Sequence, residues 1–183
     1  MTLLMTQGEK QAIDTMRALA MDGVQKAKSG HPGTAMALSP ITYILYNERM
    51  KYNPQSPNWL GRDRFILSIG HASMLLYSTL HLAGVKNLDT NGQPTHEAAV
   101  RLDDLKSFRQ LGSRCAGHPE YGHIAGIEMT TGPLGAGVAT SVGIAMADCW
   151  LANRYNKQGF ELFQSNVYAL CGDGDMMEGI SAE

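Results

Sequence analysis

Apolar residues recur at helical intervals in several segments of the chain. Thr6 and Glu9 have the spacing of a capping box, and the apolar positions that follow predict a helix over about 8–28. The segment 35–50 is apolar enough for a mostly buried helix, which Pro40 kinks or breaks. Further helices are predicted over 72–83, 101–110 and 138–155, of which 101–110 suits a charged surface and 138–155 begins with small residues that permit close packing.

Two short apolar runs predict strands, at Arg64 to Ser68 and Asn166 to Cys171. A glycine turn and a helix follow each run, and this repeated order is typical of an α/β fold with a parallel sheet flanked by helices. Ligands of such folds bind beyond the carboxyl ends of the strands, where the turns lie. The intervening segments are expected to be loops, namely 84–95, with a turn at Asn91-Gly92, and 112–126.

Length, charge and composition exclude several classes of protein. The 183 residues suffice for one compact domain or for part of a larger protein. With 15 basic and 17 acidic residues the net charge is −2, and no basic tract indicates nucleic-acid binding. No segment reaches the ~18 apolar residues of a membrane span, and the N-terminus lacks the pattern of a signal peptide. Three scattered cysteines favour neither disulfides nor a cysteine metal site, so we expect a cytoplasmic protein.

The segment Gly172-Asp173-Gly174 follows the second predicted strand and raises a chemical question. A glycine-rich phosphate loop uses bare backbone N–H groups, whereas a carboxylate at Asp173 repels phosphate. If a diphosphate binds here, a cation must stand between, and Mg²⁺ does this with one or two carboxylates and phosphate oxygens. The alternative is a plain strand-ending turn whose acidic residues favour a helix N-terminus.

Other motifs in the chain favour the diphosphate site over the plain turn. In one order along the chain stand SGHPG, DRFILSxGHAS, FRQLGSRxxGHPE, GIEMTTGPLGxG and GDGxxxEGISxE. Together they resemble the thiamine-diphosphate-binding N-terminal part of transketolases, from Ile13 onward. The resemblance implies an α/β diphosphate-binding domain in a homodimer with active sites between subunits. It also implies the transfer of a two-carbon ketol unit between sugar phosphates, such as xylulose 5-phosphate and ribose 5-phosphate, in the pentose phosphate pathway.

The resemblance assigns a role to each matching residue. His71 and Gly174 resemble positions at the cofactor's diphosphate, and Asp173 resembles the ligand of Mg²⁺ or Ca²⁺. The loop residues at its aminopyrimidine are Gly132, Pro133 and Leu134. Catalytic roles fall to His31 and His118, which resemble histidines that hydrogen-bond sugar hydroxyls or the reacting oxygen, and to Glu178, which resembles an interface glutamate near the aminopyrimidine.

The other histidines carry no catalytic assignment. His81 falls on an apolar helix face and is interpreted as structural. His96 begins HEAAV, which misses the HExxH zinc motif because Val100 stands at its last position. His123 lies in a loop and receives no role. Two residues depart from the family pattern, because Ile69 replaces a small or polar residue and Ala136 replaces a glutamine.

The largest departure is at the end of the chain. In the resembled family an asparagine and a backbone carbonyl on a further strand complete the metal site, and pyrimidine-binding and C-terminal domains follow. We therefore expect residues 1–183 to be the N-terminal part of a diphosphate-binding domain that is active only with the missing segments, supplied in the complete homodimer or by a second chain. The alternatives are a non-catalytic transketolase-like module and a sibling enzyme such as dihydroxyacetone synthase or deoxyxylulose-phosphate synthase. The GHPE and SGHPG motifs favour transketolase over the last of these.

Overall fold

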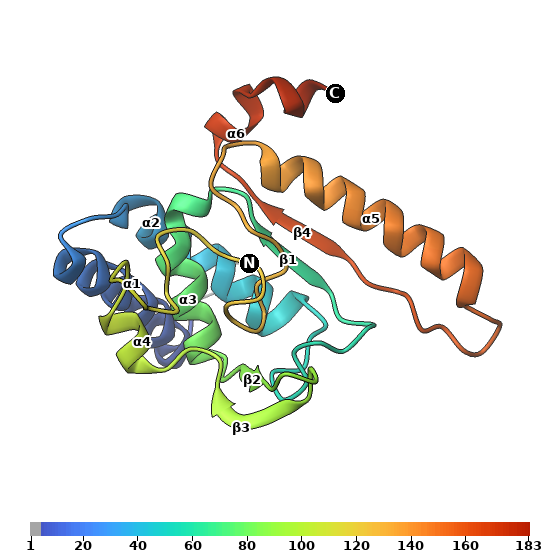
Figure 1. Cartoon of the computed structure of the whole chain (residues 1–183), viewed down its shortest axis with the longest axis horizontal. Helices are drawn as coiled ribbons and strands as arrows, with labels where there is room; N and C mark the ends of the chain where they lie inside the picture. The colour runs from blue at the N-terminus through green and yellow to red at the C-terminus, as the bar shows by residue number, and fades with distance from the viewer. Residues whose placement is uncertain (1–4) are drawn as a thin grey trace.

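The fold is built around a pair of parallel strands. The computed structural model describes residues 5–183; residues 1–4, part of the stretch searched for a signal peptide, lie outside the described residues. Strand β1 (Arg64–Leu67) pairs with β4 (Val167–Leu170) in register from Arg64↔Val167 to Leu67↔Leu170. Figure 1 shows this pair between a group of helices on one side and a single long helix on the other. The predicted α/β class with a parallel sheet flanked by helices is confirmed.

Helix α1 (Gln7–Ala27) begins as its sequence predicts. The backbone N–H of Glu9 donates to Thr6 Oγ1 at 3.3 Å, and the N–H of Thr6 donates to the Glu9 carboxylate at 2.6 Å. These two bonds satisfy donors that a helix start otherwise leaves unpaired. The helix ends at Ala27, and its capping residue Lys28 adopts a left-handed φ of 51° that turns the chain into Ser29–Gly33.

The predicted helix over 35–50 is present but changes its form, and the expectation that it is mostly buried is wrong, because α2 buries only Ala35, Ser39 and Thr42. Helix α2 (Pro32–Ile44) starts with Pro32 at its first position, where a proline costs no hydrogen bond. It continues through Pro40 and then widens into a π-helix over Leu45–Arg49. Proline therefore does not end this helix.

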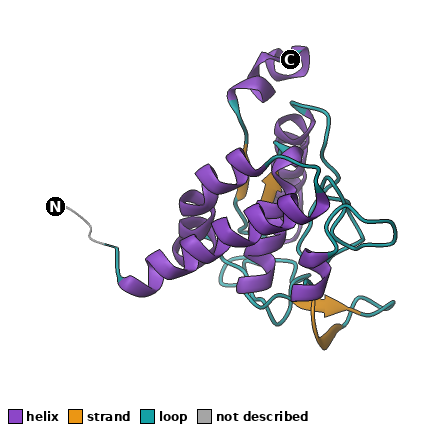
Figure 2. Cartoon of the chain, turned by 90° about the vertical axis from the view of Figure 1, so that its left-hand side faces the viewer, coloured by secondary structure: helices purple, strands orange, loops and turns teal. Residues whose placement is uncertain are grey.

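Helix α3 (Ser73–Leu82) forms the centre of the core. A 3₁₀ turn, Gly70–Ala72, leads into it from β1, and every residue from Ser73 to Leu80 is buried. Helix α4 (Leu102–Lys106) is shorter than predicted and buries Asp104 and Leu105. Figure 2, which views the molecule from the side of α1 to α4, shows this group of helices in front of the parallel strands. The core cluster joins residues of α1, α3, α4 and β1 with Phe108 after α4, and its members include Met16, Phe65, Leu75, Tyr77 and Leu105.

A small antiparallel hairpin departs from the sequence prediction. Strand β2 (Lys86–Leu88) pairs with β3 (Pro94–Ala98), although 84–95 is predicted as a polar loop and no element is predicted over 96–98. The expected turn at Asn91-Gly92 is present, with a φ of 74° at Gly92 and its N–H donated to Asp89 O at 3.0 Å. The strands are exposed or half-buried and polar, so they lack the apolar alternation by which strands are recognised.

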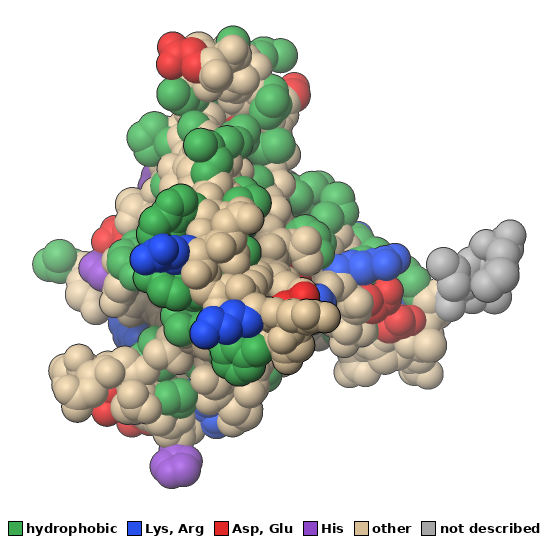
Figure 3. Space-filling model, turned by 90° about the vertical axis from the view of Figure 1, so that its right-hand side faces the viewer, with side chains coloured by type: hydrophobic (Ala, Val, Ile, Leu, Met, Phe, Trp, Pro, Cys, Tyr) green, Lys and Arg blue, Asp and Glu red, His purple; other side chains and the backbone are tan. Residues whose placement is uncertain are grey.

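Helix α5 (Ala136–Tyr155) covers the second face of the sheet. It leaves much apolar surface exposed, and Figure 3, which views this side, shows apolar side chains spread across it. After β4 come a short helix α6 (Asp173–Met177) and a 3₁₀ turn (Gly179–Ala182). Within residues 5–183 no helix is long and apolar enough to cross a membrane. The exposed apolar residues here include Val142, Met146, Trp150, Met176, Met177 and Ile180.

Candidate functional site

Glycine-rich segments meet beyond the carboxyl ends of β1 and β4. A Cβ atom on Gly70 would lie 2.7 Å from Thr131 Oγ1 and 2.9 Å from Gly132 N, so only glycine allows this approach. A Cβ on Gly174 would contact Leu134 Cδ1 at 3.5 Å. The turn after β1, the loop before α5 and the turn after β4 therefore form one surface, as expected for an α/β fold.

Three predicted histidines gather at this surface. The imidazole rings of His31 and His71 meet edge to face, with 4.9 Å between centroids and an interplanar angle of 61°. The ring of His118 lies 3.6 Å from where Gly132 would carry a Cβ. His31 is exposed, whereas His71 and His118 are half-buried. Histidines from three separate motifs thus lie near one another, and His118 lies directly against Gly132.

The surroundings favour the neutral form of two of these histidines. Burial lowers the pKa of His71, the neighbouring His31 lowers it further, and the negative charge of Asp175 opposes both. Burial also lowers the pKa of His118, together with the positive charge of Arg109 and the other two histidines. A neutral imidazole carries one N–H donor and one acceptor nitrogen, which suits hydrogen bonding to hydroxyls and proton exchange.

The loop that carries His118 is held by helix α3. Tyr77 donates its hydroxyl to Ala116 O at 2.9 Å and is also 3.0 Å from His118 O. Ser73 Oγ donates to Gly117 O at 2.9 Å. Buried side chains on the core helix thereby fix an irregular loop whose backbone carbonyls would otherwise lack partners.

Arg109 is a residue that the sequence interpretation missed. It adopts a left-handed φ of 59°, which is rare for a residue with a side chain. Its Nη1 donates to Ser29 Oγ at 3.1 Å, and its Nε lies 2.7 Å from where Gly117 would carry a Cβ. The guanidinium therefore lies between the Ser29–Gly33 turn and the loop of His118. The left-handed backbone of a residue other than glycine cannot be predicted from a single sequence, so Arg109 was not recognised.

Asp175 was also missed as a site residue. It is fully buried, and its carboxylate accepts hydrogen bonds from Ser68 Oγ at 2.6 Å, Gly135 N at 2.9 Å and Gly172 N at 2.9 Å. Burial acts to raise the pKa of Asp175, but these three bonds and nearby His71 outweigh it, so the net pKa is lowered. Its sequence context matched an ordinary acidic residue at a helix start.

The remaining predicted residues lie near the same end of the sheet. Asp173 is exposed as the first residue of α6. Glu178 is exposed and lies between the last residue of α6 and the start of the 3₁₀ turn Gly179–Ala182. A Cβ on Gly135 would come within 3.1 Å of Glu178 Cβ, which places Glu178 against the loop before α5. Ile69 is buried against Gly172.

The donor set limits what metal this chain can hold. Residues 5–183 contain no group of three or more His, Cys, Asp or Glu side chains arranged to bind a metal ion. Asp173 offers one exposed carboxylate beside the Gly172–Gly174 turn. A single carboxylate fits a Mg²⁺ ion whose other ligands are phosphate oxygens and waters, and it does not fit a metal site made by this chain alone.

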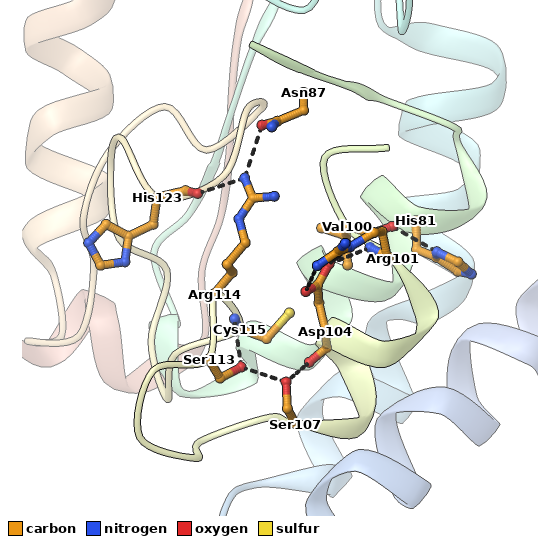
Figure 4. Close-up of polar contacts among 10 residues, drawn as sticks. All are labelled: His81, Asn87, Val100, Arg101, Asp104, Ser107, Ser113, Arg114, Cys115 and His123. Carbon is orange, nitrogen blue, oxygen red and sulfur yellow. Dashed lines mark hydrogen bonds and ion pairs between the residues drawn. The ribbon is translucent and has the colours of Figure 1, made fainter. Parts of the chain in front are cut away.

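His81 and His123 lie outside the site, and Figure 4 draws the polar contacts around them. His81 Nδ1 lies 2.9 Å from Val100 O, in agreement with a structural interpretation. His123 is exposed, and its backbone carbonyl accepts a bond from Arg114 Nη2 at 3.1 Å. The same Nη2 donates to Asn87 Oδ1 at 2.9 Å, so this arginine ties the loop after His118 to β2.

Comparison with known proteins gives consistent results. A family model described as the thiamine diphosphate binding domain of transketolase matches residues 8–183. A transketolase from Geobacillus stearothermophilus is 53% identical over 175 residues, which cover 96% of this chain and 24% of that protein.

Solved structures show the same likeness. A transketolase from Leishmania mexicana superposes with a TM-score of 0.83 at 46% identity and covers 96% of this chain and 24% of its own. A mutant transketolase from Pichia stipitis in complex with xylulose 5-phosphate has a TM-score of 0.83 at 43% identity, over 95% of this chain and 24% of its own. The chain therefore spans about a quarter of the length of the relatives it matches.

Proposed function

Because this chain belongs to the transketolase thiamine diphosphate-binding domain family, we propose that it is the diphosphate-binding portion of a working transketolase. The complete enzyme would transfer a two-carbon ketol unit from a ketose phosphate to an aldose phosphate. The observation that carries the proposal is the clustering of His31, His71 and His118, with His118 against Gly132 of the loop before α5. Residues 1–183 would form the N-terminal part of the diphosphate-binding domain, with the pyrimidine-binding and C-terminal domains supplied from outside this segment.

The residues at the carboxyl ends of the strands would hold the cofactor. His71 and Gly174 would contact its diphosphate, and the Gly132–Leu134 loop its aminopyrimidine. Asp173 would be the protein carboxylate on a Mg²⁺ or Ca²⁺ ion shared with the diphosphate. When bound, thiamine diphosphate supplies a nucleophilic carbon that adds to the carbonyl of the donor sugar.

His31 and His118 would act on the sugar. The lowered pKa of His118 keeps its imidazole neutral near pH 7, so that it can accept a proton from a hydroxyl and return it. His31 is in ring contact with His71 and is more exposed than His118. Two donor-acceptor groups beside the cofactor loop are what proton exchange at neighbouring sugar oxygens requires.

We propose the substrates and partners by analogy with the transketolase family. The similarity to a transketolase solved with xylulose 5-phosphate supports that ketose as donor, with ribose 5-phosphate as acceptor, in the pentose phosphate pathway of the cytoplasm. A homodimer, or a second chain with the missing domains, would complete the site. Glu178 would then lie at the interface between subunits, near the aminopyrimidine. The exposed apolar surface of α5 and α6 is consistent with further protein packing there.

Calorimetric titration of thiamine diphosphate and Mg²⁺ provides the test. The 183-residue chain by itself should bind weakly or not at all, because it offers one metal carboxylate and one side of the cofactor site. Addition of the remaining segments of the enzyme should restore binding and ketol transfer from xylulose 5-phosphate to ribose 5-phosphate. Tight stoichiometric binding by the chain alone would contradict the shared-site proposal.

The same reconstitution separates the alternatives. A non-catalytic module would assemble with the remaining segments and give no transfer at saturating cofactor. A dihydroxyacetone synthase would take the ketol unit from xylulose 5-phosphate but would need an acceptor other than ribose 5-phosphate. Asp173→Ala serves as the inactive control for this reconstitution. It removes the proposed metal ligand at an exposed position, so it should abolish transfer and leave folding intact.

A further inference from the structure

Asp175 joins three segments that are far apart in the sequence. Its carboxylate accepts bonds from Ser68 at the end of β1, from Gly135 in the loop before α5 and from Gly172 after β4. Oδ1 takes the first two bonds and Oδ2 takes the third. One buried side chain therefore contacts each of the strand-end segments that form the candidate site.

The same carboxylate occupies the N-terminus of α5. Gly135, the residue that caps this helix at a φ of 79°, donates its N–H to Asp175. Val138 N donates to Ser68 Oγ at 3.1 Å, and Ser68 Oγ in turn donates to Asp175. A helix N-terminus attracts anions, including phosphate. Here an anion of the chain itself already takes that place, so a phosphate group has to be held by other residues.

The packing around Asp175 leaves little room for movement. A Cβ on Gly137 would lie 2.5 Å from Ser68 Cα, so the first turn of α5 rests directly on the end of β1. A Cβ on Gly135 would lie 3.2 Å from Asp175 O. The loop before α5 is thus in contact with both the backbone and the carboxylate of Asp175.

We propose that Asp175 is a positioning residue, which holds the Gly132–Gly135 loop and the Gly172–Gly174 turn at a fixed separation before any cofactor binds. This inference rests on the proposed function, because it takes these two segments as the aminopyrimidine and diphosphate contacts. Asp175 itself, being fully buried, does not touch the cofactor. Pre-arranged segments bind more tightly, since the ordering is not left to the binding step.

Amide hydrogen exchange on the 183-residue chain tests the positioning itself. Asp175→Asn keeps the shape of the side chain but turns an amide donor or a weaker acceptor toward Gly135 and Gly172. Exchange at these two amides should become roughly ten-fold faster or more, while amides of the buried helix α3 keep their rates. Ser68→Ala should speed exchange at Val138 and leave Gly172 unchanged, because Ser68 does not contact Gly172. Asp103→Asn, an exposed change of equal charge, is the control.

A second measurement tests the consequence for the cofactor. In the assembled enzyme, Asp175→Asn should raise the thiamine diphosphate concentration needed for half-maximal activity by about ten-fold, while turnover at saturating cofactor stays within about three-fold of wild type. Equal acceleration of all amides, or unchanged exchange at Gly135 and Gly172, would overturn the proposal. The proposal would also be overturned if Asp175→Asn lost turnover while the thiamine diphosphate concentration for half-maximal activity stayed unchanged. If the wild type shows no dependence on thiamine diphosphate, the proposed function fails, and the exchange data still decide the positioning role.

Discussion

The imidazole rings of His31 and His71 meet edge to face at a centroid distance of 4.9 Å, although one precedes α2 and the other precedes α3. This contact brings the Ser29–Gly33 turn onto the turn that follows β1. His118 reaches the same surface from a loop held by Tyr77. The core helix α3 thus links the turn of His71, which precedes it, to the loop of His118, which its Tyr77 holds.

Removal of the proposed sugar-contacting histidines should reduce turnover. In the reconstituted enzyme, His31→Ala or His118→Ala should lower ketol transfer by roughly ten- to ten-thousand-fold, the range for a lost proton-transfer or hydrogen-bonding group. His81→Ala is the control, because His81 bonds Val100 O inside the fold and should affect stability more than turnover. Full activity of both site variants, with folding intact, would remove these histidines from the site.

The stability of the chain should fall in mildly acidic solution. The pKa values of His71 and His118 are lowered in the folded state, whereas in the unfolded chain they return to ~6.5. Between the folded and unfolded pKa values the unfolded chain binds more protons, so the free energy of unfolding decreases as the pH falls through ~6.5 and levels off below the folded pKa values.

Urea unfolding at a series of pH values measures this dependence. A variant with both His71→Gln and His118→Gln should lose most of the decrease near pH ~6.5. The lowered pKa values of Asp104 and Asp175 act in a separate, more acidic window, below their ordinary range. A wild-type free energy of unfolding that stays constant from neutral pH to below ~6 would contradict the prediction.

Asp173 and Glu178 should separate metal binding from assembly. In the reconstituted enzyme, Asp173→Ala should abolish metal-dependent binding of thiamine diphosphate, because it removes the proposed carboxylate ligand. Glu178→Gln should leave Mg²⁺ binding largely intact and weaken dimerisation or cofactor activation. Sedimentation and cofactor titration measure the two effects. Wild-type dimer affinity, cofactor affinity and turnover in Glu178→Gln would end its interface role.

The close packing of α5 on β1 predicts opposite effects for two glycines of the same helix. Gly137→Ala should destabilise the chain by roughly 1–3 kcal/mol, because its Cβ would lie 2.5 Å from the backbone of Ser68. Gly143→Ala should stabilise it by about 0.5–1 kcal/mol, since nothing lies within 4 Å and alanine favours helix. Thermal unfolding compares the two. Equal stability of both variants would show that the first turn of α5 can shift away from β1.

Local sequence was sufficient for much of the fold. The capping box at Thr6 and Glu9, the apolar runs of β1 and β4, and the periodic helices α1, α3 and α5 all lie close to their predicted ranges. Their signals act over a few residues, through helix capping and through the period of the apolar side chains. The ordered motifs likewise identified the family that the comparison confirms.

The tertiary structure decided what depends on residues far apart in the chain. The pairing of β2 with β3 joins polar strands that carry no apolar alternation, and the left-handed Arg109 is held by its contact with Ser29. Asp175 in the sequence is one more acid at a helix start; burial against Ser68, Gly135 and Gly172 makes it a structural anion. A buried carboxylate is stable only where donors from distant segments converge on it, and no local pattern specifies that convergence.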